Sequence, residues 1–242
     1  MYPEPAVDRY TRKNLKTDKF AQEVTHGFEF LSEHSTDVKR YAAIALAVLV
    51  LAAGIYFYMR HQAGARAEAL AQALRIDDAT VGGAVNPANL HYNTQEEKDK
   101  ARTKAFTDLA TKYHGTQEGA IAGIYLASDL ADKAKLPEAE KVFLDVMNSA
   151  PKPYASLARM SLAQVYAAEG KTAEAEKLLR AAIASPTTLV SKEAATIELA
   201  HILAKTNPAE ARKLLEPLRT ERSAVSRAAV QGLGDIPQYA GK

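Results

Sequence analysis

The stretch LAQVYAAEGKTAEAEKLLRAAIASP, residues 162–186, decides the fold because it contains two short amphipathic helices separated by a turn at Gly170-Lys171. Residues at helical spacing line one face of each predicted helix: Leu162, Ala163 and Tyr166 in the first, and Ala175, Leu179 and Ala182 in the second. Large residues opposite small ones allow two antiparallel helices to interlock at short range. The stretch therefore predicts a helical hairpin.

This hairpin recurs at an offset of 36 residues, and self-similarity at a fixed offset is the signature of a repeat protein. Five columns agree across three units: Glu138, Glu174 and Glu210; Ala139, Ala175 and Ala211; Lys141, Lys177 and Lys213; Val142, Leu178 and Leu214; Phe143, Leu179 and Leu215. The order of leucine, alanine, tyrosine, alanine and leucine in residues 162–186 resembles the tetratricopeptide repeat. The period is 36 rather than about 34, which predicts slightly longer turns between units.

The fold class predicted for residues 60–242 is all-α, a tetratricopeptide-repeat-like α-solenoid with clear units at about 118–151, 154–186 and 190–220. No alternating β-branched run appears in this alanine-, leucine-, glutamate- and lysine-rich region. Residues 62–78 and 94–113 predict a degenerate first unit, interrupted by the loop 79–93. We expect that loop to be a mobile surface loop rather than a binding loop, and the helix 223–231 to cap the stack.

An apolar run, YAAIALAVLVLAAGIYFYM, occupies residues 41–59 without a charged or amide side chain. A helix of this length is roughly 28 Å long, close to the hydrocarbon core of a bilayer at about 30 Å. Tyrosine and phenylalanine stand at its ends, where aromatic rings favour the membrane interface. We predict a single transmembrane helix, in preference to a buried core helix. A cleaved signal peptide is the other alternative, since Ala63-Gly64-Ala65 resembles a cleavage site.

Basic residues are concentrated before this span, in residues 1–40: Arg9, Arg12, Lys13, Lys16, Lys19, Lys39 and Arg40. The residues that follow it carry fewer, Arg60, Arg66 and Arg75. Because lysine and arginine are retained on the cytoplasmic side, the bias predicts a cytoplasmic N-terminus and a translocated C-terminal domain. In a bacterium, the location is the inner membrane, with the domain in the periplasm.

The tail 1–40 contains an apolar stripe at helical spacing, Phe20, Val24, Phe28 and Leu31. We expect a short amphipathic helix that rests on the lipid headgroups, with a cytoplasmic partner as the alternative. The sequence leaves the role of this tail open.

Composition argues against several classes of function. The net charge is +2, which is too low for a nucleic-acid binder, and the chain has no cysteine for disulfides, thiolate metal sites or nucleophilic catalysis. The six histidines are scattered without metal-ligand spacing: His26, His34, His61, His91, His114 and His201. We therefore predict a binding protein that is not an enzyme and has no cofactor and no metal.

Stacked helix pairs leave a concave surface lined by the first helix of each unit. By resemblance to tetratricopeptide repeats, twelve positions would line this groove: Ile121, Ile124, Ser128, Asp132, Leu157, Met160, Gln164, Ala168, Glu193, Thr196, Ala200 and Leu203. The set is largely apolar and weakly acidic, which suits loosely sequence-dependent binding of polypeptides. The alternative is that the final helix of the chain fills the groove.

The order of parts, together with FTDLATKYHGTQEGAIAGIYLASDLAD at residues 106–132, resembles the ancillary SecYEG translocon subunit family of bacterial inner-membrane proteins. The resemblance covers roughly residues 40–220, although the tail is longer than is usual there. It implies a membrane-tethered protein-interaction scaffold, an accessory subunit or chaperone adaptor at the export channel. The implied partners are export-channel components, a periplasmic prolyl-isomerase chaperone and unfolded polypeptides. The alternative is a periplasmic organiser of envelope assembly or cell division, and the oligomeric state stays open.

Overall fold

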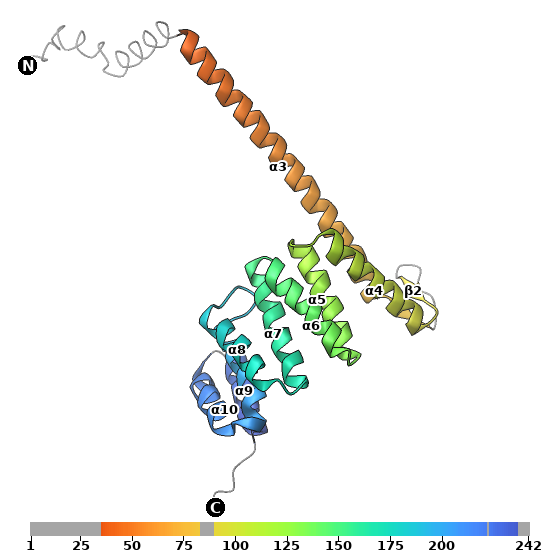
Figure 1. Ribbon diagram of the computed structural model, residues 1–242, viewed down its shortest axis with the longest axis vertical. Coiled ribbons are helices and arrows are strands. Elements are labelled where there is room, and N and C mark those ends of the chain that lie inside the picture. Colours follow the sequence, from red (N-terminus) through yellow and green to blue (C-terminus); the bar gives the residue numbers. More distant parts are fainter. Residues whose placement is uncertain (1–34, 83–89, 222, 237–242) are drawn as a thin grey trace, which may run out of the picture. The chain divides into compact units, whose positions relative to one another are not determined.

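A computed structural model describes residues 35–82, 90–221 and 223–236 (Figure 1). In this part of the chain there are nine α-helices, one 3-10 helix and two short strands: α3 (Ser35–Asp77), β1 (Thr80–Val81), β2 (His91–Tyr92), α4 (Gln95–Lys112), α5 (Gln117–Asp132), α6 (Leu136–Ser149), α7 (Lys152–Ala168), α8 (Thr172–Ala184), α9 (Lys192–Thr206), α10 (Pro208–Leu215), η1 (Glu216–Thr220) and α11 (Ser223–Asp235). The predicted amphipathic helix around residues 20–31 lies outside the described residues.

The chain divides into two compact units, residues 1–63 and residues 64–242, and the helix α3 contains the division. In the first unit, every side chain from Tyr41 to Met59 is exposed. This segment is long and apolar enough to cross a membrane, and none of it is buried against the described parts of the chain. It has the properties of a single-pass anchor.

The second unit begins with the C-terminal part of α3, which packs on α4 and α5. Four residues of α3 contact this core: Ala69, Leu70, Ala73 and Leu74. They surround Phe106 and Leu109 of α4, which are both buried. The spacing of the apolar residues in 62–78 predicts a core face of Ala67, Leu70, Ala71 and Leu74, but Ala67 and Ala71 are exposed, and Ala69 and Ala73 take their place beside the two leucines.

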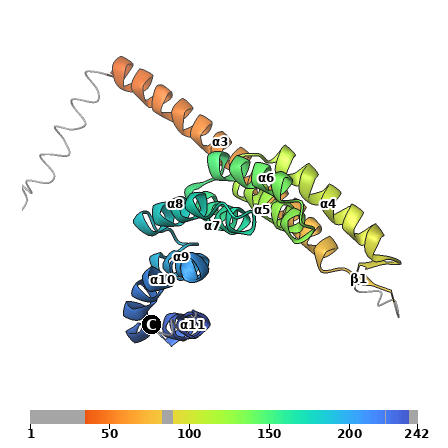
Figure 2. The ribbon, with the colours of Figure 1, turned by 60° about the horizontal axis from the view of Figure 1, so that its bottom comes forward.

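Three helix pairs follow in sequence, α5 with α6, α7 with α8, and α9 with α10, and each helix packs on the next (Figures 1 and 2). The final helix, α11, packs on α9, α10 and η1. Its Ala229, together with Ile236 directly after the helix, belongs to the same core cluster as Leu199 and Leu215. The predicted all-α repeat architecture is confirmed, with an additional parallel pair of two-residue strands, β1 and β2, in the loop 79–93.

Alanine forms much of the core between the helices. Ten alanines of the stacked pairs have no exposed surface at all: Ala122, Ala127, Ala139, Ala158, Ala163, Ala175, Ala182, Ala195, Ala200 and Ala211. A small side chain allows two helix backbones to approach closely, and Gly123 does the same against the Val146 side chain. The aliphatic and aromatic residues Phe143, Leu162, Leu179 and Leu199 fill the remaining space. The repeat columns are therefore packing positions.

Polar side chains cap the N-termini of α4 and α10. The Thr94 hydroxyl accepts a hydrogen bond from the backbone N–H of Glu97 at 3.2 Å, and the Glu97 carboxylate accepts one from the backbone N–H of Asn93 at 3.2 Å. At the start of α10, the Asn207 side chain accepts from the Glu210 amide at 3.3 Å. Pro208 follows as the first helical residue, where its missing N–H costs nothing.

The turns within the first two pairs each require one residue with left-handed backbone. Gly170 has a φ of 78° between α7 and α8, and the equivalent residue between α5 and α6 is Ala134, with a φ of 57°. Glycine adopts this region without cost, whereas a Cβ disfavours it by about 1–2 kcal/mol. Nothing lies within 4 Å of a Cβ built on Gly170. The cost of an alanine at this position therefore comes from its backbone conformation and not from a steric clash.

Exchanging these two residue types is expected to change stability in opposite directions. Ala134→Gly should raise the free energy of unfolding by about 0.5–1 kcal/mol, and Gly170→Ala should lower it by about 1 kcal/mol. Urea denaturation followed by circular dichroism measures both. A stabilised Gly170→Ala protein would contradict the described turns.

Candidate protein-binding surface

The structure brings together four of the predicted groove residues, two from α5 and two from α7. Ser128, Asp132, Gln164 and Ala168 line one cavity of about 220 Å³, whose deeper wall is formed by Phe143 and by other side chains of α5, α6 and α7. Asp132, Gln164 and Ala168 are exposed. The first helices of adjacent units thus share a polar-rimmed hollow with an aromatic residue in its wall.

The apolar groove positions on α5 and α7 are less accessible than the sequence predicts. Ile121 and Ile124 are half-buried, and Ile124 packs on the core cluster that contains Ala127 and Phe143. Leu157 and Met160 are also half-buried, and both pack on the cluster around Val190 in the connection between α8 and α9. Much of their apolar surface therefore serves the fold of the chain itself.

The groove residues predicted on α9 need correction. Thr196, Ala200 and Leu203 are buried, with exposed fractions of 9%, 0% and 2%. Glu193 is half-buried and lines a different cavity, between α8, α9, α10 and η1. Ala200 and Leu203 belong to the core cluster that also includes Ala229 and Ile236. Ala200 and Leu203 are therefore core residues, whereas Glu193 and Thr196 line the cavity between α8, α9, α10 and η1.

The physical reason is a one-residue shift in the repeat register. The buried alanines Ala127 and Ala163 are 36 residues apart, but Ala163 and its buried counterpart Ala200 are 37 apart. Leu162 and Leu199, both fully buried, show the same offset of 37. The connection before α9 has seven residues, 185–191, whereas the connection before α7 has only two, 150–151. The connection before α10 is the single residue Asn207, and α10 again begins 36 residues after α8.

With an offset of 37, the α9 residues equivalent to Leu157, Met160, Gln164 and Ala168 are Ala194, Ile197, His201 and Lys205. Ala194, His201 and Lys205 are exposed and Ile197 is half-buried, and like their counterparts on α5 and α7 none of them is fully buried. The Gln164 amide donates a hydrogen bond to the Glu198 carboxylate at 3.0 Å and so links α7 to α9. The pair Leu199-Ala200, which repeats Leu162-Ala163, is the sequence signal that reveals this register.

The corrected surface carries a different charge from the predicted one. On α9 it has Ala194, Ile197, His201 and Lys205 in place of Glu193, Thr196, Ala200 and Leu203, so it exchanges a carboxylate for a histidine and a lysine, while Asp132 and Glu198 supply carboxylates. Its charges are therefore mixed. Such a surface suits polar and apolar contacts with a polypeptide rather than the burial of one large apolar ligand.

A charged cluster around Tyr166 joins α6 to the C-terminal end of α7. The Tyr166 hydroxyl donates to the Glu140 carboxylate at 3.1 Å, and the Lys171 ammonium lies 3.1 Å from Glu140 and 2.8 Å from Glu169. Burial, followed by the hydrogen bond to Glu140, raises the pKa of the Tyr166 hydroxyl above its usual value. Hydrogen bonds to Glu169 and Glu140 raise the pKa of Lys171.

A second cluster joins α3, α4 and α5. The Arg102 guanidinium lies 2.7 Å from the Asp77 carboxylate and 3.1 Å from Asp129, which is buried. Lys133 lies 2.7 Å from Asp129 as well. Because Asp129 is buried but paired with two cations, it supports the packing of three helices. Across the described ranges, no group of three or more histidine or carboxylate side chains has the arrangement of a metal site.

A family model described as a tetratricopeptide repeat-like domain matches residues 36–188, more than half of the chain. The chain belongs to this family. The tetratricopeptide repeat-like match contains the apolar segment of α3 and continues through α8, and the pair α9–α10 with α11 follows it. No curated protein and no solved structure matches the chain.

The register of α9 can be tested with two adjacent residues. Ala200→Glu places a charge in the core and is expected to lower the free energy of unfolding by more than about 3 kcal/mol, or to abolish the cooperative transition. His201→Glu changes an exposed position and should shift stability by about 0.5 kcal/mol or less. Urea denaturation of the two variants compares them directly. If His201→Glu lowers the free energy of unfolding more than Ala200→Glu does, His201 is the buried residue, and the offset of 37 on α9 is wrong.

Proposed function

We propose that this chain is a single-pass inner-membrane protein whose tetratricopeptide repeat-like domain binds proteins in the periplasm, as an accessory subunit or chaperone adaptor of the bacterial protein-export translocon. The observation that carries the proposal is α3, one uninterrupted helix that contains an exposed apolar segment and the first packed helix of the repeat domain. The repeat domain is thus covalently held next to a membrane anchor.

The anchor is supported by the exposure of residues 41–59. Large side chains such as Leu49 and Phe57 are 66% and 68% exposed, respectively. Transfer of each such side chain from water to an apolar environment is favourable by roughly 1.5–3 kcal/mol. The backbone of a helix makes its hydrogen bonds within the helix and so needs no other partner in lipid. A bilayer supplies the apolar environment that the described chain does not.

The orientation rests on the distribution of basic residues. Residues 1–40 contain seven lysines and arginines, with Lys39 and Arg40 directly before the apolar segment. Under the positive-inside rule these residues stay in the cytoplasm. The tetratricopeptide repeat-like domain is then in the periplasm.

Protein binding is supported by the side chains that α5, α7 and α9 present beside one another. The cavity lined by Ser128, Asp132, Gln164 and Ala168 offers hydroxyl, carboxylate and amide groups next to Phe143. Polar groups of this kind hydrogen-bond to the main chain of an extended polypeptide, and the mixed charge favours no single sequence. This is the behaviour required of a protein that assists many exported chains.

The translocon role rests on the resemblance of residues 106–132 and on the order of tail, span and repeats. In the structure this stretch forms the end of α4 and all of α5, and it supplies Phe106, Leu109 and Ala122 to the core and Asp129 to the charged cluster. Organisation of envelope assembly or cell division is the competing role. Crosslinking separates the two.

A photo-crosslinking amino acid at Ala168, which is exposed and lines the cavity, is expected to capture export-channel components or polypeptides in transit in living cells. The matched control is Ala173, an exposed alanine on α8 away from this cavity, where the same crosslinker should give at least about tenfold less product. Mass spectrometry identifies the products. Division proteins as the main Ala168 product, or equal products at both positions, would contradict the proposal.

A further inference from the structure

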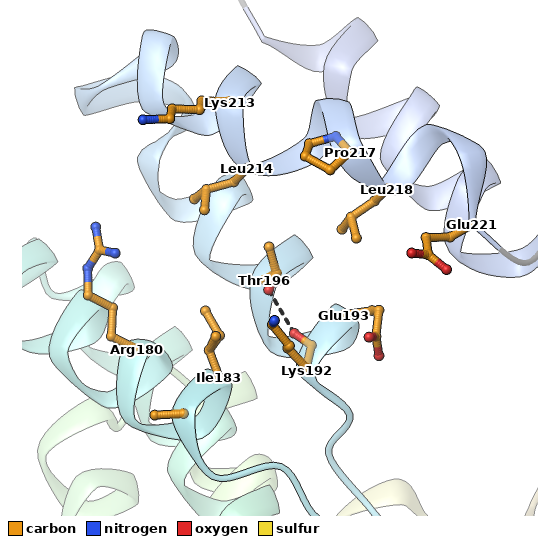
Figure 3. A pocket seen from close by; sticks show the side chains of 11 residues that line it. Arg180, Ile183, Lys192, Glu193, Thr196, Lys213, Leu214, Pro217, Leu218 and Glu221 are labelled. Carbon is orange, nitrogen blue, oxygen red and sulfur yellow. Dashed lines mark hydrogen bonds between the residues drawn. The ribbon is translucent and has the colours of Figure 1, made fainter.

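A second and larger cavity lies at the far end of the repeat stack, between α8, α9, α10 and η1 (Figure 3). Its volume is about 510 Å³, within the range of about 300–1,000 Å³ typical of ligand sites. Ile183, Leu214, Pro217 and Leu218 give it an apolar floor. Most of its lining comes from α8, α10 and η1, which contribute nothing to the surface formed by Gln164 and Ala168.

The charged side chains at the two ends of this floor differ in sign. On α8, Arg180 precedes Ile183 by one helical turn, and on α10, Lys213 precedes Pro217 and Leu218. Figure 3 shows Arg180 and Lys213 together at one end of the cavity and Glu221 at the opposite end. The apolar side chains stand between them. The cavity therefore has a basic end and an acidic end.

The basic end can take one additional carboxylate through Lys213. Arg180 already forms ion pairs with Glu176 and Glu210. Lys213 is exposed, and within the described ranges no carboxylate pairs with it. Midway along the wall, Lys192 and Glu193 are adjacent and opposite in charge, so they add little net charge there. The hydroxyl of Thr196 donates to the Lys192 carbonyl at 2.8 Å and is already satisfied.

We propose that this cavity is a second protein-docking site, which takes a short peptide segment of a partner that carries a carboxylate, then leucine-sized apolar side chains, then a cation. The carboxylate pairs with Lys213, the apolar side chains cover Leu214 and Leu218, and the cation pairs with Glu221. The apolar contact supplies binding free energy, and the two charges at the rim select the partner. This site is separate from the surface on α5 and α7 and does not depend on the translocon role.

Three fluorescein-labelled peptides test the site by fluorescence polarisation with the full-length protein in lipid nanodiscs. All three contain alanine-leucine-leucine-alanine, flanked by glutamate and lysine in the first, by two glutamates in the second and by two lysines in the third. The first peptide is expected to bind with a dissociation constant below about 1 mM, at least about threefold tighter than either of the others.

Lys213→Glu reverses the charge at the basic end without touching the apolar floor. It should weaken binding of the mixed peptide about fivefold and make the peptide with two lysines the preferred ligand. Lys177→Glu is the matched control, because Lys177 is the exposed residue at the same repeat position one unit earlier, outside the cavity. It should leave the order of the three affinities unchanged.

The proposal is overturned if no peptide binds, if the three bind equally, or if Lys177→Glu changes the preference as much as Lys213→Glu does. Self-association of the protein that Lys213→Glu abolishes, in the absence of peptide binding, would assign the cavity to a second copy of the chain and would also overturn it. Sedimentation velocity in the same nanodiscs detects that outcome.

Discussion

An apolar helix surface that no other described part of the chain covers is the constraint on which the account depends. Nineteen consecutive residues of α3, from Tyr41 to Met59, are exposed on every side of the helix. Water disfavours this surface, whereas the hydrocarbon core of a bilayer accepts it and leaves all backbone hydrogen bonds within the helix. The same helix continues to Asp77 and contributes Ala73 to the core around Phe106. The apolar segment and the first packed helix of the repeat domain are therefore parts of one helix.

The repeat domain is held together by the close approach of helices at alanine positions and by large side chains buried between them, such as Phe143, Leu162 and Leu179. Alanine fills the contact positions of each pair, so each contact buries little area and relies on the fit between neighbouring backbones. Charged clusters add to this fit. Lys171 connects Glu140 of α6 to Glu169 beyond α7, and Arg180 connects α8 to Glu210 of α10. These clusters join successive units, and the hydrogen bond from Gln164 to Glu198 links the first helices α7 and α9.

The helix pairs could be predicted from the sequence because buried alanines and leucines repeat at nearly constant spacing, and because Gly170, Asn207 and Pro208 mark the ends of helices. The accessibility of Asp132 at the end of α5 follows from the same spacing. On α9 the prediction was wrong, because the columns at offset 36 come from the second helices, whereas the seven-residue connection 185–191 moves the first helix by one residue. A single fixed offset cannot represent two helices that shift independently.

The cavity at the end of the stack could not be predicted at all. Its lining combines α8, the start of α9, α10 and the 3-10 helix η1, and their placement depends on the length of that same connection and on the change of helix type at Glu216. Neither feature has a residue pattern of its own. Pro217, which marks the 3-10 helix, is equally compatible with the end of a repeat unit.

The most direct test of the account uses the fact that the chain contains no cysteine. Single cysteines at Thr11, Leu49 and Ala173 can be labelled with a membrane-impermeant maleimide in spheroplasts. The account predicts that Ala173→Cys reacts at once, that Thr11→Cys reacts only after the membrane is broken, and that Leu49→Cys reacts only after detergent is added. Reaction of Leu49→Cys in intact spheroplasts, at a rate close to that of Ala173→Cys, would contradict it.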